Sequence, residues 1–135
     1  MLSFEVLTDR YAICRLSPDD PIPPWAVRDG TNEQSFISLT WTPDELSIVC
    51  RESSVPGHVE SEPDWTCIRV AGKLDFALVG ILSAITKHLA EAGISVFALS
   101  TFDTDYLLIK NPHWPLAEKT LSNAGYAVYP LKQQA

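Results

Sequence analysis

Segments of two kinds alternate along the second half of the sequence, and their order is the strongest constraint on the fold. Short runs rich in β-branched and aromatic residues predict strands at 65–71, 94–100, 105–110 and 126–131. Between them, apolar residues recur at helical spacing and predict helices at 76–92 and 114–124. The resulting order, β-α-β-β-α-β, predicts an α+β, ferredoxin-like sandwich in which two helices cover one face of an antiparallel sheet.

Capping signals mark the ends of both predicted helices. Asp75 is a favourable N-cap for the first helix, and Leu74 with Val79 would form a hydrophobic staple across it. Gly93 and Gly125 follow the last apolar residues of the two helices. Because glycine tolerates the left-handed conformation that commonly ends a helix, we expect each helix to stop there.

The first half of the chain reads as short strands joined by turns. The predicted strands are 2–8, 11–16, 35–42 and 46–52, and the first two form a hairpin around Asp9 and Arg10. A single helical turn is expected at 25–28. The polar segment 53–64 holds two prolines and a glycine and predicts a seam. We therefore expect two tandem modules, residues 1–64 and 65–135, of which the first is an abbreviated version of the second.

The charge and the apolar content of the sequence limit which kinds of binding partner we expect. The 135 residues include 17 acidic and 10 basic side chains, for a net charge of −7. This balance argues against a nucleic-acid partner and against docking on an anionic membrane. No apolar run approaches the length of a membrane span, and the first residues do not resemble a signal peptide.

The sequence offers few of the residue patterns that hold metals or cofactors. Cys14, Cys50 and Cys67 are widely spaced and form no CxxC pair, so we expect buried, reduced thiols and a cytoplasmic setting. His58, His88 and His113 have no metal-ligand spacing. GxGxxG, P-loop, GxSxG and HExxH motifs are all missing. We therefore expect neither a metal nor a cofactor.

Two aspartates, separated by one residue, lie where the predicted strand 105–110 begins. As a pair, Asp103 and Asp105 could hold a divalent cation, perform acid–base chemistry, contact a ligand or shape a turn. A three-residue motif is frequent by chance, and Asp103 with Thr104 are ordinary hairpin residues. The spacing by itself leaves these alternatives open.

A second candidate lies at the loop before the first predicted helix. Gly72 would let a ligand approach the backbone, free N–H groups at a helix start suit a carboxylate, and the carboxylate of Asp75 could accept an ammonium group. The simpler interpretation is that Gly72 turns the chain and Asp75 caps the helix. From the residues alone, capping is the favoured interpretation.

Two stretches resemble the ACT domain family. They are GKLD (72–75), at the first strand-to-helix turn, and STFDTDY (100–106), at the following hairpin. The stretch LTWTPDELSIVCRE (39–52) fits a narrower group, the small proteins with two ACT-type modules that are related to aspartate kinase regulatory regions and to CASTOR-type arginine sensors. Ala71 departs from the pattern, because many ACT domains have a proline there.

The resemblance implies ferredoxin-like modules with an amino-acid effector held between modules or subunits, and it does not imply catalysis. It gives Asp105 a ligand-facing position and makes Phe102 an apolar wall. The ligand-binding residues that it implies are Gly72, Leu74, Asp75, Phe76, Ser100, Thr101, Phe102, Thr104 and Asp105.

The leading hypothesis is therefore a non-enzymatic regulatory or sensor protein that binds a small amino acid. A homodimer is expected, because a sheet edge beside the last strand invites pairing, and the regulated protein partner is unidentified. One alternative is a structural dimerisation module that binds no ligand. The other is a metal-dependent enzyme that uses Asp103 and Asp105.

Overall fold

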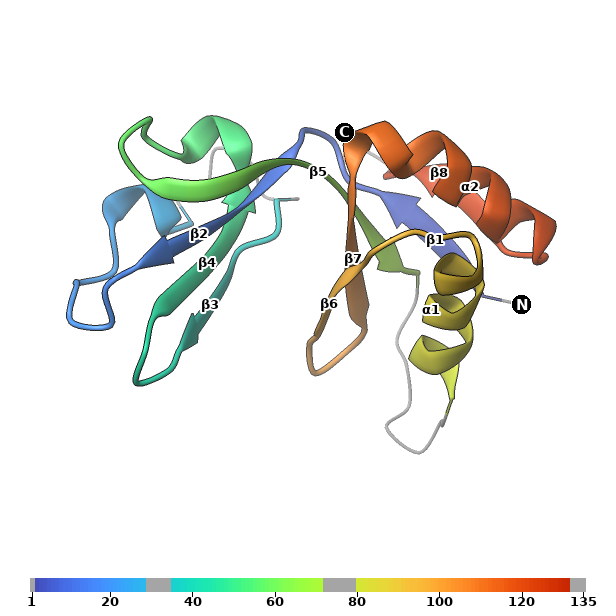
Figure 1. Ribbon diagram of the computed structural model, residues 1–135, viewed down its shortest axis with the longest axis horizontal. Helices are drawn as coiled ribbons and strands as arrows, with labels where there is room; N and C mark the ends of the chain where they lie inside the picture. The colour runs from blue at the N-terminus through green and yellow to red at the C-terminus, as the bar shows by residue number, and fades with distance from the viewer. Residues whose placement is uncertain (1, 29–34, 72–79, 132–135) are drawn as a thin grey trace. The chain divides into compact units, whose positions relative to one another are not determined.

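The computed structural model describes residues 2–28, 35–71 and 80–131. The chain forms two compact units, which are coloured along the chain in Figure 1. Unit 1 comprises Met1–Thr8 and Thr66–Ala135, and unit 2 comprises Asp9–Trp65. The expected division into 1–64 and 65–135 differs from these units at the N-terminus, because the first strand belongs to unit 1.

Unit 1 contains the predicted β-α-β-β-α-β order. Its elements are the second half of β5 (Glu60–Val70), α1 (Ile81–Glu91), β6 (Phe97–Ser100), β7 (Asp105–Lys110), the 3-10 turn η3 (Asn111–His113), α2 (Trp114–Asn123) and β8 (Ala127–Pro130). Strand β1 (Ser3–Val6) joins them, giving the sheet order β6-β7-β5-β1-β8. The α+β, ferredoxin-like fold class is confirmed.

Strand β1 corrects the hairpin predicted for residues 2–16. It pairs antiparallel with β5 and parallel with β8, whereas the following strand β2 (Tyr11–Leu16) pairs with β4 (Leu46–Arg51) and with the first half of β5. The two strands are thus not partners of each other. Local turn chemistry at Asp9 and Arg10 suggested a hairpin, but the long-range pairing with β5 prevails.

One face of the unit 1 sheet packs against both helices (Figure 1). Phe4 lies opposite Val70 and Val6 opposite Ile68, so apolar side chains of β1 and β5 share this face. The period of two in β7 adds Leu107 and Ile109 to it. The helices contribute residues at a spacing of four, since the fully buried side chains of α1 and α2 are Ile85, Leu89, Ala117 and Leu121.

Both helices end at the glycines that the sequence predicted. Gly93 and Gly125 have φ values of 77° and 97°. After α1, the N–H of Ile94 donates to the carbonyl of Leu89 at 2.9 Å, and after α2 the N–H of Tyr126 donates to Leu121 at 3.0 Å. These bonds satisfy carbonyls that the helix itself leaves unpaired.

The start of α1 differs from the prediction. Helix α1 begins at Ile81, and its N-cap is Gly80 with a left-handed φ of 78°. A residue in this conformation cannot continue a right-handed helix, so Asp75 is not the cap of α1. Residues 72–79, which include Asp75, lie outside the described part of the chain.

Unit 2 is a small sheet with short 3-10 turns. The strand order is β3-β4-β2-β5, with β3 at Ser38–Trp41, and the turns are η1 (Pro24–Ala26) and η2 (Glu52–Ser54). The predicted turn at 25–28 corresponds to η1. Its core contains two thiols, since Cys14 and Cys50 are buried with Ala12, Leu46 and Ile48.

The predicted seam 53–64 is partly strand. Strand β5 begins at Glu60, and Ile13 lies opposite Glu62 whereas Tyr11 lies opposite Trp65. Pro63 and Asp64 therefore face the single residue Ala12, which defines a β-bulge. Proline lacks the N–H that a regular ladder would use, and Asp64 has a φ of 72°, so both residues suit the bulge. Polar composition predicted a seam between modules, but residues 60–64 of this segment form the irregular start of β5.

Helix α2 offers a matched test of the core. Leu121 is completely buried whereas Leu116, on the same helix, is 49% exposed. We expect Leu121→Ala to lower the free energy of unfolding by about 2–5 kcal/mol through lost burial and a cavity. Leu116→Ala should cost less than about 1 kcal/mol. Urea denaturation followed by circular dichroism measures both, and equal losses would contradict the assigned helix face.

The helix stop at Gly93 is also testable. A Cβ at this position would contact nothing within 4 Å, so Gly93→Ala isolates the backbone cost of its φ of 77°. We expect a loss of about 1–2 kcal/mol in unfolding free energy. Gly57 has the same open surroundings without a positive φ, and Gly57→Ala should change stability by less than about 0.5 kcal/mol. A harmless Gly93→Ala would rule out the left-handed stop.

Candidate functional site

The hairpin between β6 and β7 carries five of the predicted site residues. Ser100 and Asp105 lie opposite each other as the last pair of the ladder. The N–H of Thr101 donates to the carbonyl of Thr104 at 2.8 Å and closes the connection. The predicted turn at 101–104 is therefore confirmed.

Side-chain hydrogen bonds join the two sides of this hairpin. The hydroxyl of Thr101 donates to the carbonyl of Thr104 at 3.0 Å, and the N–H of Thr104 lies 3.2 Å from the same hydroxyl. The hydroxyl of Ser100 donates to Oδ1 of Asp105. A carboxylate has about four acceptor sites, so this bond orients Asp105 and leaves capacity for a further donor.

One contact ties the hairpin to the end of β5. The hydroxyl of Thr104 donates to the carbonyl of Val70 at 2.8 Å, and the next N–H, of Ala71, donates to Ser3 at 2.9 Å. The hairpin thus lies beside the point at which the chain leaves β5. This contact joins residues 34 positions apart, which no local pattern could reveal.

Four predicted site residues, Gly72, Leu74, Asp75 and Phe76, lie outside the described residues. Phe102 has 73% of its surface exposed at the tip of the hairpin. The structure therefore brings Ser100, Thr101, Thr104 and Asp105 together, while an apolar wall from Phe102 would need a further partner to cover it.

Tyr106 of β7 lies beside an ion pair between β5 and β1, on the face of the sheet opposite Asp105. Arg69 pairs with Glu5 across β5 and β1 at 3.1 Å. Burial opposes the charge of Arg69, but hydrogen bonds with Tyr106 and Glu5 outweigh it and raise the pKa of the guanidinium. The residues Asp105 and Tyr106 are consecutive on the strand, so their side chains point to opposite faces. This ion pair therefore stabilises the sheet rather than lining the hairpin.

The thiols are buried, as predicted. Burial raises the pKa of Cys67 above its ordinary value. Within residues 2–28, 35–71 and 80–131, no three histidine, cysteine or acidic side chains lie close enough to hold a metal ion. No helix of the described chain has the length and apolar character to cross a membrane.

Sequence reasoning missed a pocket in unit 2. Its lining comes from three short segments, 24–28, 35–37 and 50–54, that are far apart in the chain. None of them carries a recognisable motif, and only the folding of β4 beside η1 joins them. The one available signal is the stretch 17–24 before Trp25, whose four prolines restrict the backbone.

Comparison with known proteins identifies the second half of the chain. A family model described as an ACT domain matches residues 60–123, and a second model, which describes an N-terminal domain, matches residues 9–58. The human protein CASTOR3P is 29% identical over 101 residues. That segment is 65% of this chain and 62% of CASTOR3P, so the match spans less than two thirds of the curated relative.

Solved structures extend the similarity to the whole chain. The protein Atu0741 from Agobacterium tumefaciens is 34% identical, with a TM-score of 0.87 over 99% of this chain and 96% of that one. The regulatory subunit of aspartate kinase from Thermus thermophilus, in a ligand-free form, has a TM-score of 0.58 at 11% identity and covers 87% and 93% of the two chains. At that identity the likeness concerns the fold.

The contact between Thr104 and Val70 predicts how the hairpin is held. Thr104→Val keeps the size of the side chain and removes the hydroxyl donor. We expect a loss of about 1 kcal/mol in unfolding free energy and faster amide exchange in residues 100–105. Thr120→Val is the control, because its hydroxyl bonds only within helix α2, to Leu116 at 2.7 Å. Unchanged exchange in the hairpin of Thr104→Val would contradict this role.

Proposed function

Residues 60–123 match the model of an ACT domain, and from this premise we propose that the chain is a non-enzymatic regulatory or sensor protein that binds a small amino acid. The similar aspartate kinase chain is a regulatory subunit. The single observation that carries the proposal is the geometry of Asp105. Its carboxylate is oriented by Ser100 at the mouth of a hairpin, beside the end of β5.

The ligand chemistry follows from this carboxylate. A free amino acid presents an ammonium group, for which an oriented carboxylate is a strong charge-assisted partner. Asp105 would accept a hydrogen bond from the ammonium group. The hydrogen bonds between Thr101 and Thr104 would hold the turn in place beside it. The resemblance adds Gly72 and Asp75 as contacts for the polar end of the ligand.

A homodimer is part of this proposal, and it would use the β8 edge of the unit 1 sheet, at the opposite end of the strand order from the hairpin. Strand β8 ends the sheet order of unit 1, and its Tyr129 is 55% exposed. Such an edge favours pairing with another chain, although Pro130 limits how far a new ladder could extend. Ligand binding would then shift the equilibrium between two packings of the dimer and, by reciprocity, the affinity for a regulated protein.

The experiment is calorimetric titration with each of the twenty amino acids at millimolar concentration. We expect at least one to bind, and Asp105→Asn to weaken that binding by about tenfold or more, because the ammonium loses its anionic partner. Asp103→Asn is the matched control, since it removes the same charge two residues earlier, within the turn. It should change the affinity by less than about threefold.

Two outcomes would overturn the proposal. Folded protein that binds none of the twenty amino acids would leave a purely structural role for the hairpin. Equal losses in the Asp103 and Asp105 variants would mean that net charge alone, and not the position of Asp105, determines binding. Circular dichroism of each variant separates loss of binding from loss of folding.

A further inference from the structure

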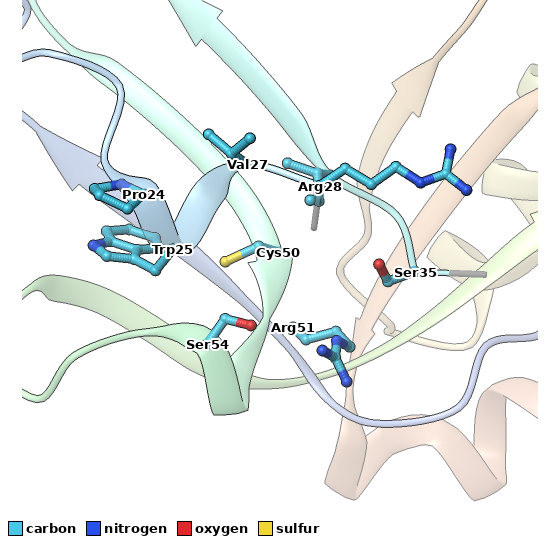
Figure 2. A pocket seen from close by; sticks show the side chains of 9 residues that line it. Pro24, Trp25, Val27, Arg28, Ser35, Cys50, Arg51 and Ser54 are labelled. Carbon is cyan, nitrogen blue, oxygen red and sulfur yellow. The ribbon is translucent and has the colours of Figure 1, made fainter. Parts of the chain in front are cut away.

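The pocket of unit 2 has features of a second ligand site. It is lined by η1 and the following residues, by the segment before β3 and by the end of β4 with η2 (Figure 2). Its volume is about 230 Å³. At roughly 30 Å³ for each water, that is space for about seven or eight waters, or for one small organic molecule. The nine lining residues are Pro24, Trp25, Val27, Arg28, Ser35, Ile37, Cys50, Arg51 and Ser54.

The lining is divided into an apolar side and a polar side. Figure 2 shows the rings of Pro24 and Trp25 on one side of Cys50, and Ser35 and Arg51 on the other. A ligand that fills this space therefore needs an apolar part and a polar part. This combination of apolar walls and a few polar groups is typical of small-molecule sites.

The charge of the lining is opposite to that of the protein. The whole chain has a net charge of −7, yet the nine described lining residues include Arg28 and Arg51 and no acidic residue, and the carboxylate of Asp9 pairs with Arg51. Figure 2 shows the side chain of Arg28 running away from Cys50, whereas Arg51 directly follows Cys50 in β4. An anionic group is thus favoured here, and the nine described lining residues offer no carboxylate to an ammonium group.

The remaining contacts of Arg51 and Cys50 are compatible with an anion. Nη1 of Arg51 donates to Asp9 at 3.2 Å, which orients the guanidinium and uses one of its five N–H donors. The arginine side chain is 25% exposed, so water screens it only in part. A hydrogen bond with Cys14, together with burial, raises the pKa of Cys50, so its thiol stays neutral beside the ligand.

We propose that this pocket binds a small organic carboxylate with a short branched or aromatic apolar group and no ammonium. The carboxylate would accept from Arg51, with Ser35 and Ser54 at its sides, while the apolar group would lie against Trp25 and Ile37. This ligand class differs from the amino acid proposed for the hairpin, because the hairpin offers the carboxylate of Asp105 to an ammonium group and the nine described lining residues of the pocket offer none. The two sites would let one chain respond to two kinds of metabolite.

The test compares three probes that share one apolar chain. Isocaproate carries a carboxylate, isocaproamide is uncharged, and leucine adds an ammonium group. We expect isocaproate to bind at millimolar concentration and to shift the indole N–H signal of Trp25 in the NMR spectrum, assigned with Trp25→Phe. Isocaproamide and leucine should leave this signal unchanged, although leucine is free to bind at the hairpin.

Two arginine variants locate the anion. Arg51→Gln should weaken isocaproate binding by about tenfold or more. Arg10→Gln is the matched control, because Arg10 also forms an ion pair in unit 2, with Asp64 at 2.9 Å, but does not line the pocket. It should change the affinity by less than about twofold.

A third variant keeps the test decisive if Arg51→Gln fails to fold. Asp9→Asn retains Arg51 and removes its charged partner, and asparagine tolerates the φ of 69° at this position. Isocaproate should then bind at least as tightly as to the original protein. Weaker binding to Asp9→Asn, equal effects of the two arginine variants, or a Trp25 signal that responds equally to isocaproamide would each overturn the proposal.

Discussion

The backbone pairing of β5 is the constraint on which the rest of the structure depends. Its first half pairs with β2 in unit 2, and its second half pairs with β1 and β7 in unit 1. This single strand of eleven residues therefore provides hydrogen-bonding partners in both units. The bulge at Pro63 and Asp64 interrupts the ladder just before Thr66, where unit 1 begins. A proline and a left-handed residue are tolerated there because a bulge does not require regular pairing.

The two candidate sites depend on different strands of the sheet. The hairpin site depends on Thr104, whose hydroxyl reaches the carbonyl of Val70 at the end of β5 and so fixes the position of Asp105. The pocket in unit 2 depends on β4, since Cys50 and Arg51 at the end of that strand form one wall. Sheets provide rigid positions for such side chains, whereas the specific contacts come from the ends of strands and from turns.

The two sites carry opposite charges, so each suits a ligand group of a different charge. Asp105 is an oriented anion with remaining acceptor capacity, which suits an ammonium group. Arg51 is an oriented cation, and the nine described residues of its pocket include no acid, which suits a carboxylate. Discrimination between an amino acid and a simple carboxylate then rests on one ammonium group, because burying that group without a partner is costly.

The sequence by itself determined the order β-α-β-β-α-β, the helix stops at Gly93 and Gly125, and the hairpin turn at 101–104. These features follow from local periodicity and from residues with special backbone freedom, so they can be read from short windows. The sequence also identified Asp105 as a candidate, although its spacing from Asp103 left several roles open.

Only the tertiary structure decided the partners of β1, the cap of α1 at Gly80 and the strand that begins at Glu60. It alone assembled the pocket from 24–28, 35–37 and 50–54. The physical reason is the same in each case. Strand partners and pocket walls come from residues far apart in the chain, and which strands pair depends on the apolar surface that the whole sheet buries rather than on the turn chemistry between neighbours.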